Sequence, residues 1–377
     1  MTTDRAKGDG AGERVVAETD RLLRDARERG ASDLHLEPDA SGLRVSMRLD
    51  GVLAESERLG PEMSRPVVAR LKFLADLMTW RSDIPQEGRL RASDADGRGD
   101  LRVSTFPTVH GERAVVRFLN GRREPFAFDS LGFPADVLDE LRRALAATSG
   151  VLLLTGPAGS GKTTTLYACL GELVNRLSGR VQIITVEDPV EAVIPNVTQT
   201  QVNPAAGLTY AVALRSLLRQ DPEVVMVGEV RDRDTAECVC QAGLTGHLVL
   251  STFHGGDTAT VIARLLEMGM EPYSVTSSLR AVLAMRLVRR LCDRCGGAAS
   301  GCADCGGTGY RGRVPIVEFA TIGPELRKLI LASSDSETLA RELTRGGLRT
   351  LRQRANDAVA AKITSAAEVE RVLGPEG

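Results

Sequence analysis

One octapeptide decides how this chain folds: Gly156-Pro-Ala-Gly-Ser-Gly-Lys-Thr163. It matches the P-loop pattern G-x-x-x-x-G-K-[ST], in which backbone N–H groups and the start of the following helix surround phosphate oxygens. The apolar run 151–154 predicts the strand that enters the loop, and residues 164–173 predict the helix that leaves it. A glycine-rich turn of purely structural origin does not require strand, lysine, threonine and helix together. The octapeptide therefore predicts a nucleoside triphosphate site.

The side chains of this loop have separate predicted tasks. Lys162 reaches the β- and γ-phosphates, and the Thr163 hydroxyl ligates Mg²⁺. The other residues predicted to bind the nucleotide are Gly156, Pro157, Gly159, Ser160, Gly161 and Thr164.

Composition narrows the class of protein. The 377 residues suffice for two or three domains, and 48 basic against 50 acidic residues create no global field for nucleic acid or an anionic membrane. No apolar run approaches the roughly 20 residues that span a bilayer. Residues 1–12 have no apolar segment typical of a secretion signal, so the seven cysteines do not indicate a disulfide framework. These features predict a cytosolic α/β protein.

Residues 13–119 predict a smaller α+β domain after a disordered segment, residues 1–12. Within it we expect helices over 15–29 and 67–78, a hairpin turn at Asp50-Gly51, and strands over 32–36, 43–49, 101–106 and 113–119. Residues 120–130 form the expected linker.

Residues 131–377 predict a second domain that contains the P-loop. A helix is expected over 131–147, and the chain beyond residue 325 has a helical, polar pattern. Short apolar runs separated by helices predict a parallel sheet and an α/β fold; they lie at 151–154, 181–186, 223–227 and 248–251.

Acidic residues follow two of these strands. Glu229 ends the strand at 223–227, while the usual Walker B aspartate position holds Gly228. A carboxylate at the carboxyl end of a parallel strand faces the nucleotide crevice, where it can hold the Mg²⁺ shell or orient the attacking water. Glu187-Asp188-Pro189 adds carboxylates to the same edge. An ordinary strand-end carboxylate is the alternative.

His254 ends the strand at 248–251 and can hydrogen-bond a γ-phosphate, although a lone histidine is more often structural. Several arginines lie beside these motifs: Arg89, Arg102, Arg215, Arg219 and Arg231. An arginine is usually a solvated surface charge, but ring-forming P-loop ATPases often borrow guanidinium groups from another domain or subunit.

Two C-x-x-C pairs lie close together, Cys292/Cys295 and Cys302/Cys305. Four thiolates at this spacing suit a tetrahedral structural Zn²⁺ ion. A redox pair and an iron–sulfur cluster are the alternatives.

Taken together, these stretches resemble the secretion ATPases of type II secretion and type IV pilus assembly, from about residue 31 to about residue 319. Besides the P-loop, the acidic motifs, the segment around His254 and the cysteine pairs, five stretches carry the resemblance: Ala31-Ser-Asp-Leu-His-Leu-Glu-Pro38, Arg48-Leu-Asp-Gly51, Pro85-Gln-Glu-Gly-Arg89, residues 102–111 and Arg286-Leu-Val-Arg-Arg-Leu-Cys292.

The resemblance implies a cytoplasmic homo-hexamer that acts at the inner membrane through platform proteins, without membrane insertion or nucleic acid. A small N-terminal domain and a RecA-like motor domain would clamp ATP and Mg²⁺ between them, with a small four-cysteine zinc module attached. Hydrolysis would then drive the addition of pilin or pseudopilin subunits. The residues carried over are Glu229 as the Walker B acid, Glu187 in the aspartate box, His254 in the histidine box, Arg215 and Arg219 before the Walker B strand, and Arg89 and Arg102 on the small domain.

The chain also departs from the family pattern. Gly255-Gly256 stands where Thr-Asn is usual, so we expect added backbone freedom beside the nucleotide. Met285 replaces a common glutamine, and the short spacer between the cysteine pairs predicts a small zinc lobe. The cysteine pairs favour the extension branch over the retraction ATPases. The additional amino-terminal docking domain of the family has no counterpart here, which we interpret as truncation or as divergent docking.

Two other functions compete with this interpretation. A RecA-like nucleic-acid translocase would have a basic channel bearing aromatic residues, which the balanced charge and the 3% aromatic content do not support. A regulatory protein that binds nucleotide without turnover would have lost Lys162 or Glu229, and both are present. The sequence therefore predicts an ATP-hydrolysing assembly motor, and it leaves the cargo open.

Overall fold

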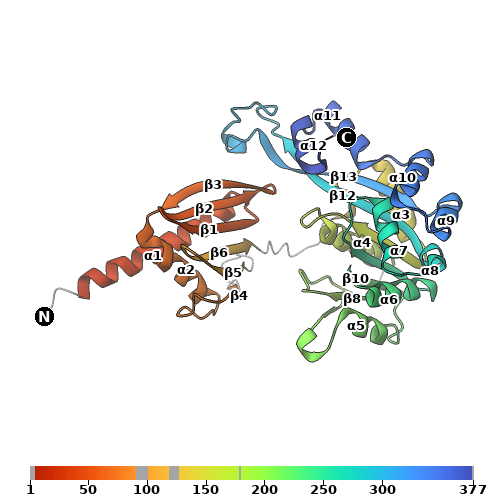
Figure 1. Ribbon diagram of the computed structural model, residues 1–377, viewed down its shortest axis with the longest axis horizontal. Coiled ribbons are helices and arrows are strands. Elements are labelled where there is room, and N and C mark those ends of the chain that lie inside the picture. The colour runs from red at the N-terminus through yellow and green to blue at the C-terminus, as the bar shows by residue number, and fades with distance from the viewer. Residues whose placement is uncertain (1–4, 91–100, 119–126, 178–179, 376–377) are drawn as a thin grey trace. The chain divides into compact units, whose positions relative to one another are not determined.

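The computed structural model describes residues 5–90, 101–118, 127–177 and 180–375. The chain divides into two compact units, Met1–Arg122 and Arg123–Gly377 (Figure 1). Within the described residues, no helix combines the length and the apolar run that a membrane span requires.

The first unit is a six-stranded antiparallel sheet with two helices. Its sheet has the strand order β3-β2-β1-β6-β5-β4. Its elements are α1 (Arg5–Glu28), β1 (Asp33–Asp39), β2 (Gly42–Leu49), β3 (Val52–Leu59), α2 (Pro61–Leu74), β4 (Gln86–Leu90), β5 (Leu101–Thr108) and β6 (Gly111–Phe118).

Alternation along the strands gives this sheet one apolar face, which α1 and α2 cover (Figure 1). On β1, for example, Leu34 and Leu36 are fully buried in the core beneath the helices. The predicted hairpin at Asp50-Gly51 is confirmed, since it joins β2 to β3 with positive φ at both residues, 48° and 85°. Asp-Gly suits this turn because both positions are left-handed.

The second unit is a seven-stranded mixed sheet with helices on both faces. Its strand order is β13-β12-β7-β11-β10-β8-β9, and every neighbouring pair is parallel except β12 with β13. The strands are β7 (Gly150–Thr155), β8 (Ile183–Glu187), β9 (Thr198–Gln201), β10 (Val224–Val230), β11 (Leu248–Phe253), β12 (Leu279–Leu291) and β13 (Tyr310–Thr321).

Short helical segments surround this sheet or connect its strands. They are η1 (Phe128–Leu131), α3 (Ala135–Leu145), α4 (Lys162–Leu177), η2 (Pro204–Ala206), α5 (Tyr210–Leu217), α6 (Arg233–Leu244), α7 (Thr258–Glu267), α8 (Pro272–Ser278), η3 (Ala303–Cys305), α9 (Pro324–Leu331), α10 (Ser336–Arg345) and α11 (Leu351–Ala360), followed by a last helix, α12 (Ala366–Leu373).

Successive residues of β7 enter different cores. Val151 and Leu153 pack with helices α5 to α10, whereas Leu152 and Leu154 pack with η1, α3 and α4. A strand buried on both faces must be apolar throughout, which explains the continuous run that predicted it. The predicted α/β fold with a smaller α+β part is confirmed.

Several expectations need correction. Helix α1 includes residues 5–12, which were expected to be disordered, because extending a formed helix gains one hydrogen bond for each residue fixed; residues 1–4 lie outside the described part. Most of the expected linker, residues 120–126, also lies outside it, while residues 128–131 form η1. The helix expected over 131–147 is α3, which begins only at Ala135, after Pro134.

Strands β12 and β13, which pair over most of their length, were not predicted from the sequence. The residues of β12 are rich in Leu, Ala, Met and Arg, which favour helix. Pairing with β7 on one side and β13 on the other outweighs that preference, because tertiary context decides strand formation.

A buried carboxylate attaches the last helix to β12. The side chain of Glu368 is fully buried and accepts hydrogen bonds from the Arg289 backbone N (2.9 Å), from the Arg289 guanidinium and from Arg371 Nε (2.7 Å). Burial alone would raise the pKa of Glu368, but the donors of Arg371 and Arg289 outweigh it and lower the pKa to about 2. The carboxylate therefore stabilises the fold only while it is ionised.

We predict that Glu368→Gln lowers the free energy of unfolding of the second unit by about 2 kcal/mol at neutral pH. A carboxyl whose pKa is lower in the folded state contributes stability above its unfolded pKa, and loses it as the pH falls toward the folded value. The difference in the free energy of unfolding between variant and parent should therefore become smaller as the pH falls from 4.5 to 2. Urea unfolding across pH measures this, with Glu370→Gln, an exposed neighbour, as the control. A gap independent of pH would contradict it.

Candidate active site

The P-loop joins β7 to α4 and packs against β12. A Cβ atom on Gly156 would lie 2.4 Å from the carbonyl oxygen of Met285, so only glycine lets the loop approach this strand. Gly161 has φ 97°, which an L side chain rarely adopts, and it lies against the Met285 side chain. Met285, which replaces the glutamine common in the family, therefore packs against the P-loop and helps to support it.

The cationic and hydroxyl groups of the loop lie at the start of α4. Lys162 Nζ donates to the carbonyl oxygens of Gly156 (2.6 Å) and Pro157 (3.0 Å). Burial lowers the pKa of Lys162, and the nearby Glu229 opposes this shift. Thr163 lies in the first turn of α4, and its hydroxyl has no side-chain partner among the described residues. The turn thus offers an ammonium and a hydroxyl to a phosphate with its metal ion.

The remaining members of the predicted loop set are placed with it. Ser160 is buried, and no described residue hydrogen-bonds its hydroxyl oxygen. Pro157 and Gly159 are exposed at the tip of the loop, and Thr164 is half-buried on α4.

Glu229 lies at the end of β10 with both carboxylate oxygens engaged. Its Oε2 accepts a hydrogen bond from His254 Nε2 at 3.0 Å, so this nitrogen must carry the proton, and its Oε1 pairs with Arg231. Arg231 also lies 3.8 Å from the Asp188 carboxylate. The structure therefore brings the acids after β8 and β10 and the histidine after β11 to one edge of the sheet.

Close packing explains why position 228 holds a glycine. A Cβ atom at this position would lie 2.7 Å from the hydroxyl oxygen of Tyr210, the first residue of α5. Burial raises the pKa of this hydroxyl, and the charges of Asp188 and Glu229 raise it further, so it stays protonated. The position where a Walker B aspartate is usual is thus filled by a phenol from another element.

Glu187 differs in its environment from Glu229. It is 3% exposed, and both its oxygens accept hydrogen bonds: Oε2 from Tyr167, and Oε1 from Thr185 (2.6 Å) and Gln199 (3.0 Å). A carboxylate saturated in this way is shielded from water. The structure therefore places Glu187 behind the edge of the sheet, whereas Glu229, with 15% of its side chain exposed, lies at it.

The Gly255-Gly256 segment is fixed, contrary to the expected backbone freedom. The carbonyl oxygens of residues 254, 255 and 256 accept side-chain hydrogen bonds from, in turn, Arg264 (2.8 Å), Thr155 (3.2 Å) and Arg286 (2.7 Å). A Cβ atom on Gly255 would lie 2.7 Å from Val261, so close packing requires glycine there. The backbone around His254 is therefore held in place.

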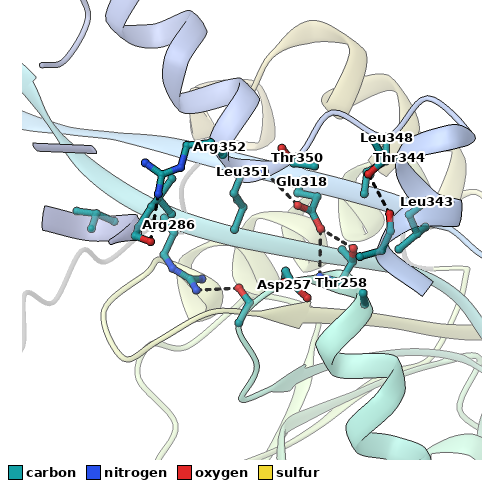
Figure 2. Close-up of a pocket in the computed structure, with 15 residues that line it drawn as sticks. Asp257, Thr258, Arg286, Glu318, Leu343, Thr344, Leu348, Thr350, Leu351 and Arg352 are labelled. Atoms are coloured by element: carbon teal, nitrogen blue, oxygen red, sulfur yellow. Dashed lines mark hydrogen bonds between the residues drawn. The ribbon is translucent and has the colours of Figure 1, made fainter. Parts of the chain in front are cut away.

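A cavity of about 350 Å³ adjoins this segment, lined in part by Arg286 and Thr258. Figure 2 shows Glu318, from β13, between Thr258 and Leu351 at the border of the cavity. Glu318 is 4% exposed and accepts from Thr258 N (3.1 Å), Thr258 Oγ1 (2.5 Å) and Leu351 N (3.0 Å). One carboxylate thus accepts hydrogen bonds from the first residues of both α7 and α11, where helix dipoles favour an anion.

Of the predicted arginines of the second unit, Arg231 belongs to this cluster, whereas Arg215 and Arg219 lie outside it. Arg215, on α5, and Arg219, just beyond it, are exposed and make no ion pair within the described residues. Arg89 and Arg102 belong to the first unit, where they lie opposite each other on β4 and β5, and Arg102 pairs with Glu87. The exposure of Arg215 and Arg219 leaves their guanidinium groups available to other molecules.

The four cysteines lie at the end of the β12–β13 hairpin (Figure 1). Their sulfur atoms all lie within 4.8 Å of one another, with Cys292–Cys302 at 3.7 Å and Cys295–Cys305 at 3.9 Å. A tetrahedral ion with bonds of about 2.3 Å separates its ligands by ~3.8 Å, so the sulfurs fit one such ion. These spacings are too long for a disulfide and leave no room for a cluster of several irons.

Comparisons with known proteins show the family to which this chain belongs. The family described as "Type II/IV secretion system protein" matches residues 6–371. The chain belongs to this family. A type II secretion system protein HxcR from Pseudomonas aeruginosa is 41% identical over 95% of this chain and 77% of its own.

A type IV pilus assembly ATPase PilB from Thermus thermophilus is 39% identical over 88% of this chain, but over only 40% of its own length. The Legionella pneumophila ATPase DotB has the same fold, with a TM-score of 0.71 and 22% identity over 94% of this chain and 95% of its own. The resemblance inferred from the motifs is thus confirmed, and this family member is an ATPase.

Sequence reasoning missed several groups at the site. The sequence places Arg231 only beside motif residues, and no motif marks Tyr167, Gln199 or Tyr210 as members of the site. The position of Tyr167, five residues after Lys162 on the predicted helix, was the available signal. Arg231 follows the end of the same strand two residues after Glu229, and this spacing is the signal in the sequence for their pairing.

We predict that Gly228→Ala lowers ATP turnover and destabilises the second unit by about 1–3 kcal/mol, because the new methyl group overpacks against the Tyr210 hydroxyl. Tyr210→Phe in the same chain removes the clashing oxygen, so the double variant should regain most of the lost stability. Thermal unfolding and turnover of the three variants measure this. Equal defects in Gly228→Ala and the double variant would show that the clash lies elsewhere.

Proposed function

We propose that this chain is the ATP-hydrolysing motor of a hexamer that powers the assembly of pseudopilus or pilus subunits. The observation that carries the proposal is the meeting of the P-loop with Glu229 and His254 at one sheet edge, in a member of the secretion family. The motor would act in the cytoplasm, at the inner membrane, through platform proteins. Relatives of both kinds leave the choice between pseudopilus and pilus to experiment.

ATP and Mg²⁺ fit the residues present. Lys162 would hold the β- and γ-phosphates, and the Thr163 hydroxyl would ligate the metal ion, whose chemistry is to neutralise charge on the phosphates. Glu229 would orient the attacking water, and the proton that His254 donates to Glu229 keeps this carboxylate in place. The remaining loop residues would surround the phosphates through their backbone N–H groups.

Arg231 sets a condition on this role. In the described structure it neutralises Glu229 and lies near Asp188. A carboxylate paired with a guanidinium is a weak base, so Arg231 would have to release Glu229 before water is activated. Transfer of the Arg231 guanidinium toward Asp188 would achieve this within the same unit.

The exposed arginines would complete the site from outside. Arg215 and Arg219 are available for a neighbouring subunit, and Arg89 and Arg102 would act from the first unit on charge at the γ-phosphate. Sites completed between chains require assembly, which is the physical reason for proposing a homo-hexamer. The proposed function does not involve binding of nucleic acid.

The test is ATP turnover measured together with mass by light scattering over a concentration series. Turnover per chain should rise as hexamers form. Lys162→Ala should abolish nucleotide binding, whereas Glu229→Gln should keep binding and lower turnover by at least about a hundredfold. Lys328→Ala and Glu237→Gln, both at exposed positions of the second unit, are the matched controls.

Two results would contradict the proposal. Full turnover by a monomer would make each chain self-sufficient and exclude a role of Arg215 and Arg219 across a subunit boundary. Turnover that persists in Glu229→Gln would remove this residue from its assigned role.

We also propose a structural Zn²⁺ ion on the four cysteines. Burial opposes ionisation of Cys305, but the N–H groups of Cys302 (3.1 Å) and Gly309 (3.2 Å) donate to its sulfur and lower its pKa to about 6. A thiolate is the form that binds the metal. Four protein ligands would fill a tetrahedral shell, so the ion would fold the hairpin end and take no part in the reaction.

Metal analysis should find one zinc per chain, and Cys292→Ser with Cys295→Ser should release it while nucleotide binding persists. The hairpin end would then lose the ion that joins its two cysteine pairs, so local proteolysis there should increase. Cys238→Ser, on α6 and outside the cluster, is the control. A parent protein without zinc, or with iron in its place, would overturn the zinc assignment.

A further inference from the structure

Tyr167 is a buried tyrosine on the helix that begins with the P-loop lysine. It is 5% exposed, and its hydroxyl oxygen has three partners. The hydroxyl donates to Glu187 Oε2 and accepts from the backbone N–H groups of Glu191 (3.1 Å) and Ala192 (3.4 Å). A single oxygen therefore links α4, the end of β8 and the loop that follows.

This loop, residues 188–194, is termed the acidic loop below. Gln199, on β9, holds it from the other side: its Oε1 accepts from Ile194 N (2.7 Å), and its Nε2 donates to Ala192 O (3.0 Å) and Glu187 Oε1 (3.0 Å). The side chains that make these bonds are buried or half-buried. Such a network fixes geometry because each broken bond leaves a buried polar atom without a partner.

The acidic loop matters because it begins with Asp188, which lies 3.8 Å from Arg231, the residue paired with Glu229. We infer that Tyr167, Glu187 and Gln199 position the acidic loop relative to the P-loop helix, so that Asp188 can take Arg231 from Glu229. Glu187 then acts as a positioning residue with no contact to water or substrate. This inference rests on the proposed hydrolytic function.

Burial and hydrogen bonding separate this role from a catalytic one. A general base needs an oxygen within reach of the attacking water. Both oxygens of Glu187 are already occupied, and burial together with Glu187 raises the pKa of Tyr167 far above neutrality, so the hydroxyl remains a donor. The raised pKa keeps the Tyr167 hydroxyl protonated at neutral pH, so it remains the donor to Glu187.

The first experiment is Tyr167→Phe, which keeps the ring in the core and removes only the hydroxyl. We expect kcat to fall on the order of tenfold or more, because a small misplacement of a reacting group costs that much, while the KM for ATP stays unchanged. Amide hydrogen exchange should quicken at Glu191 and Ala192, the two donors that lose their acceptor. Tyr273→Phe, on α8 and 72% exposed, is the matched control.

The second experiment exchanges two side chains, Glu187→Gln with Gln199→Glu. The exchange keeps one carboxylate and one amide in contact and preserves an acceptor for Tyr167, while the hydrogen bond from residue 199 to Ala192 O is lost because a carboxylate cannot donate. If the network positions the loop, the pair should therefore recover part of the kcat that Glu187→Gln alone loses. Gln199→Ala, at a half-buried position, provides a variant that releases Ile194 without touching the P-loop helix.

The outcomes decide between the alternatives. Unchanged kcat in Tyr167→Phe would overturn the inference, and so would a fall in kcat without faster exchange in the acidic loop. Failure of the exchanged pair to recover kcat, with normal hydrogen exchange, would return Glu187 to a catalytic role. A parent chain without ATP turnover would refute the proposed function, while the exchange measurement would still show whether Tyr167 holds the loop.

Discussion

Burial of the central strands on both faces is the constraint on which the rest of the second unit depends. Strands β7, β8, β10 and β11 run between two cores, so polar groups can act only where these strands end. The P-loop, Glu187-Asp188, Glu229 and His254 all lie at such an end. Because the four strands are parallel, their carboxyl ends meet at one edge of the sheet. This arrangement alone brings the functional groups together.

The order of the strands then decides which groups meet. Strand β11 lies between β7 and β10, so His254 is a neighbour of both the P-loop and Glu229. Strand β8 lies beyond β10, which sets Asp188 one strand further from the lysine, and Arg231 bridges the interval. The competition between two carboxylates for one guanidinium is thus a consequence of sheet topology.

The sequence predicted what short-range patterns encode. Continuous apolar runs identified the buried strands, the octapeptide identified the nucleotide loop, and Asp50-Gly51 identified a hairpin. It did not predict β12 and β13, since the residues of β12 also suit a helix and its partner β7 lies far away in the chain. The network of Tyr167 and Gln199 could not be predicted either, because these residues lie 32 positions apart and are linked through Glu187 and Ala192 only after α4 and β9 have packed on β8.

Glu318 has a consequence for the autonomy of the C-terminal helices. Its buried carboxylate receives donors from the first residues of α7 and α11, and neither helix alone satisfies both oxygens. A chain ending before residue 350 would lack the Leu351 N–H donor and would expose the apolar residues of β12 and β13 that pack against α11 and α12. The terminal helices are therefore part of the fold of the second unit, and a shortened protein would lose both a buried hydrogen bond and a hydrophobic cluster.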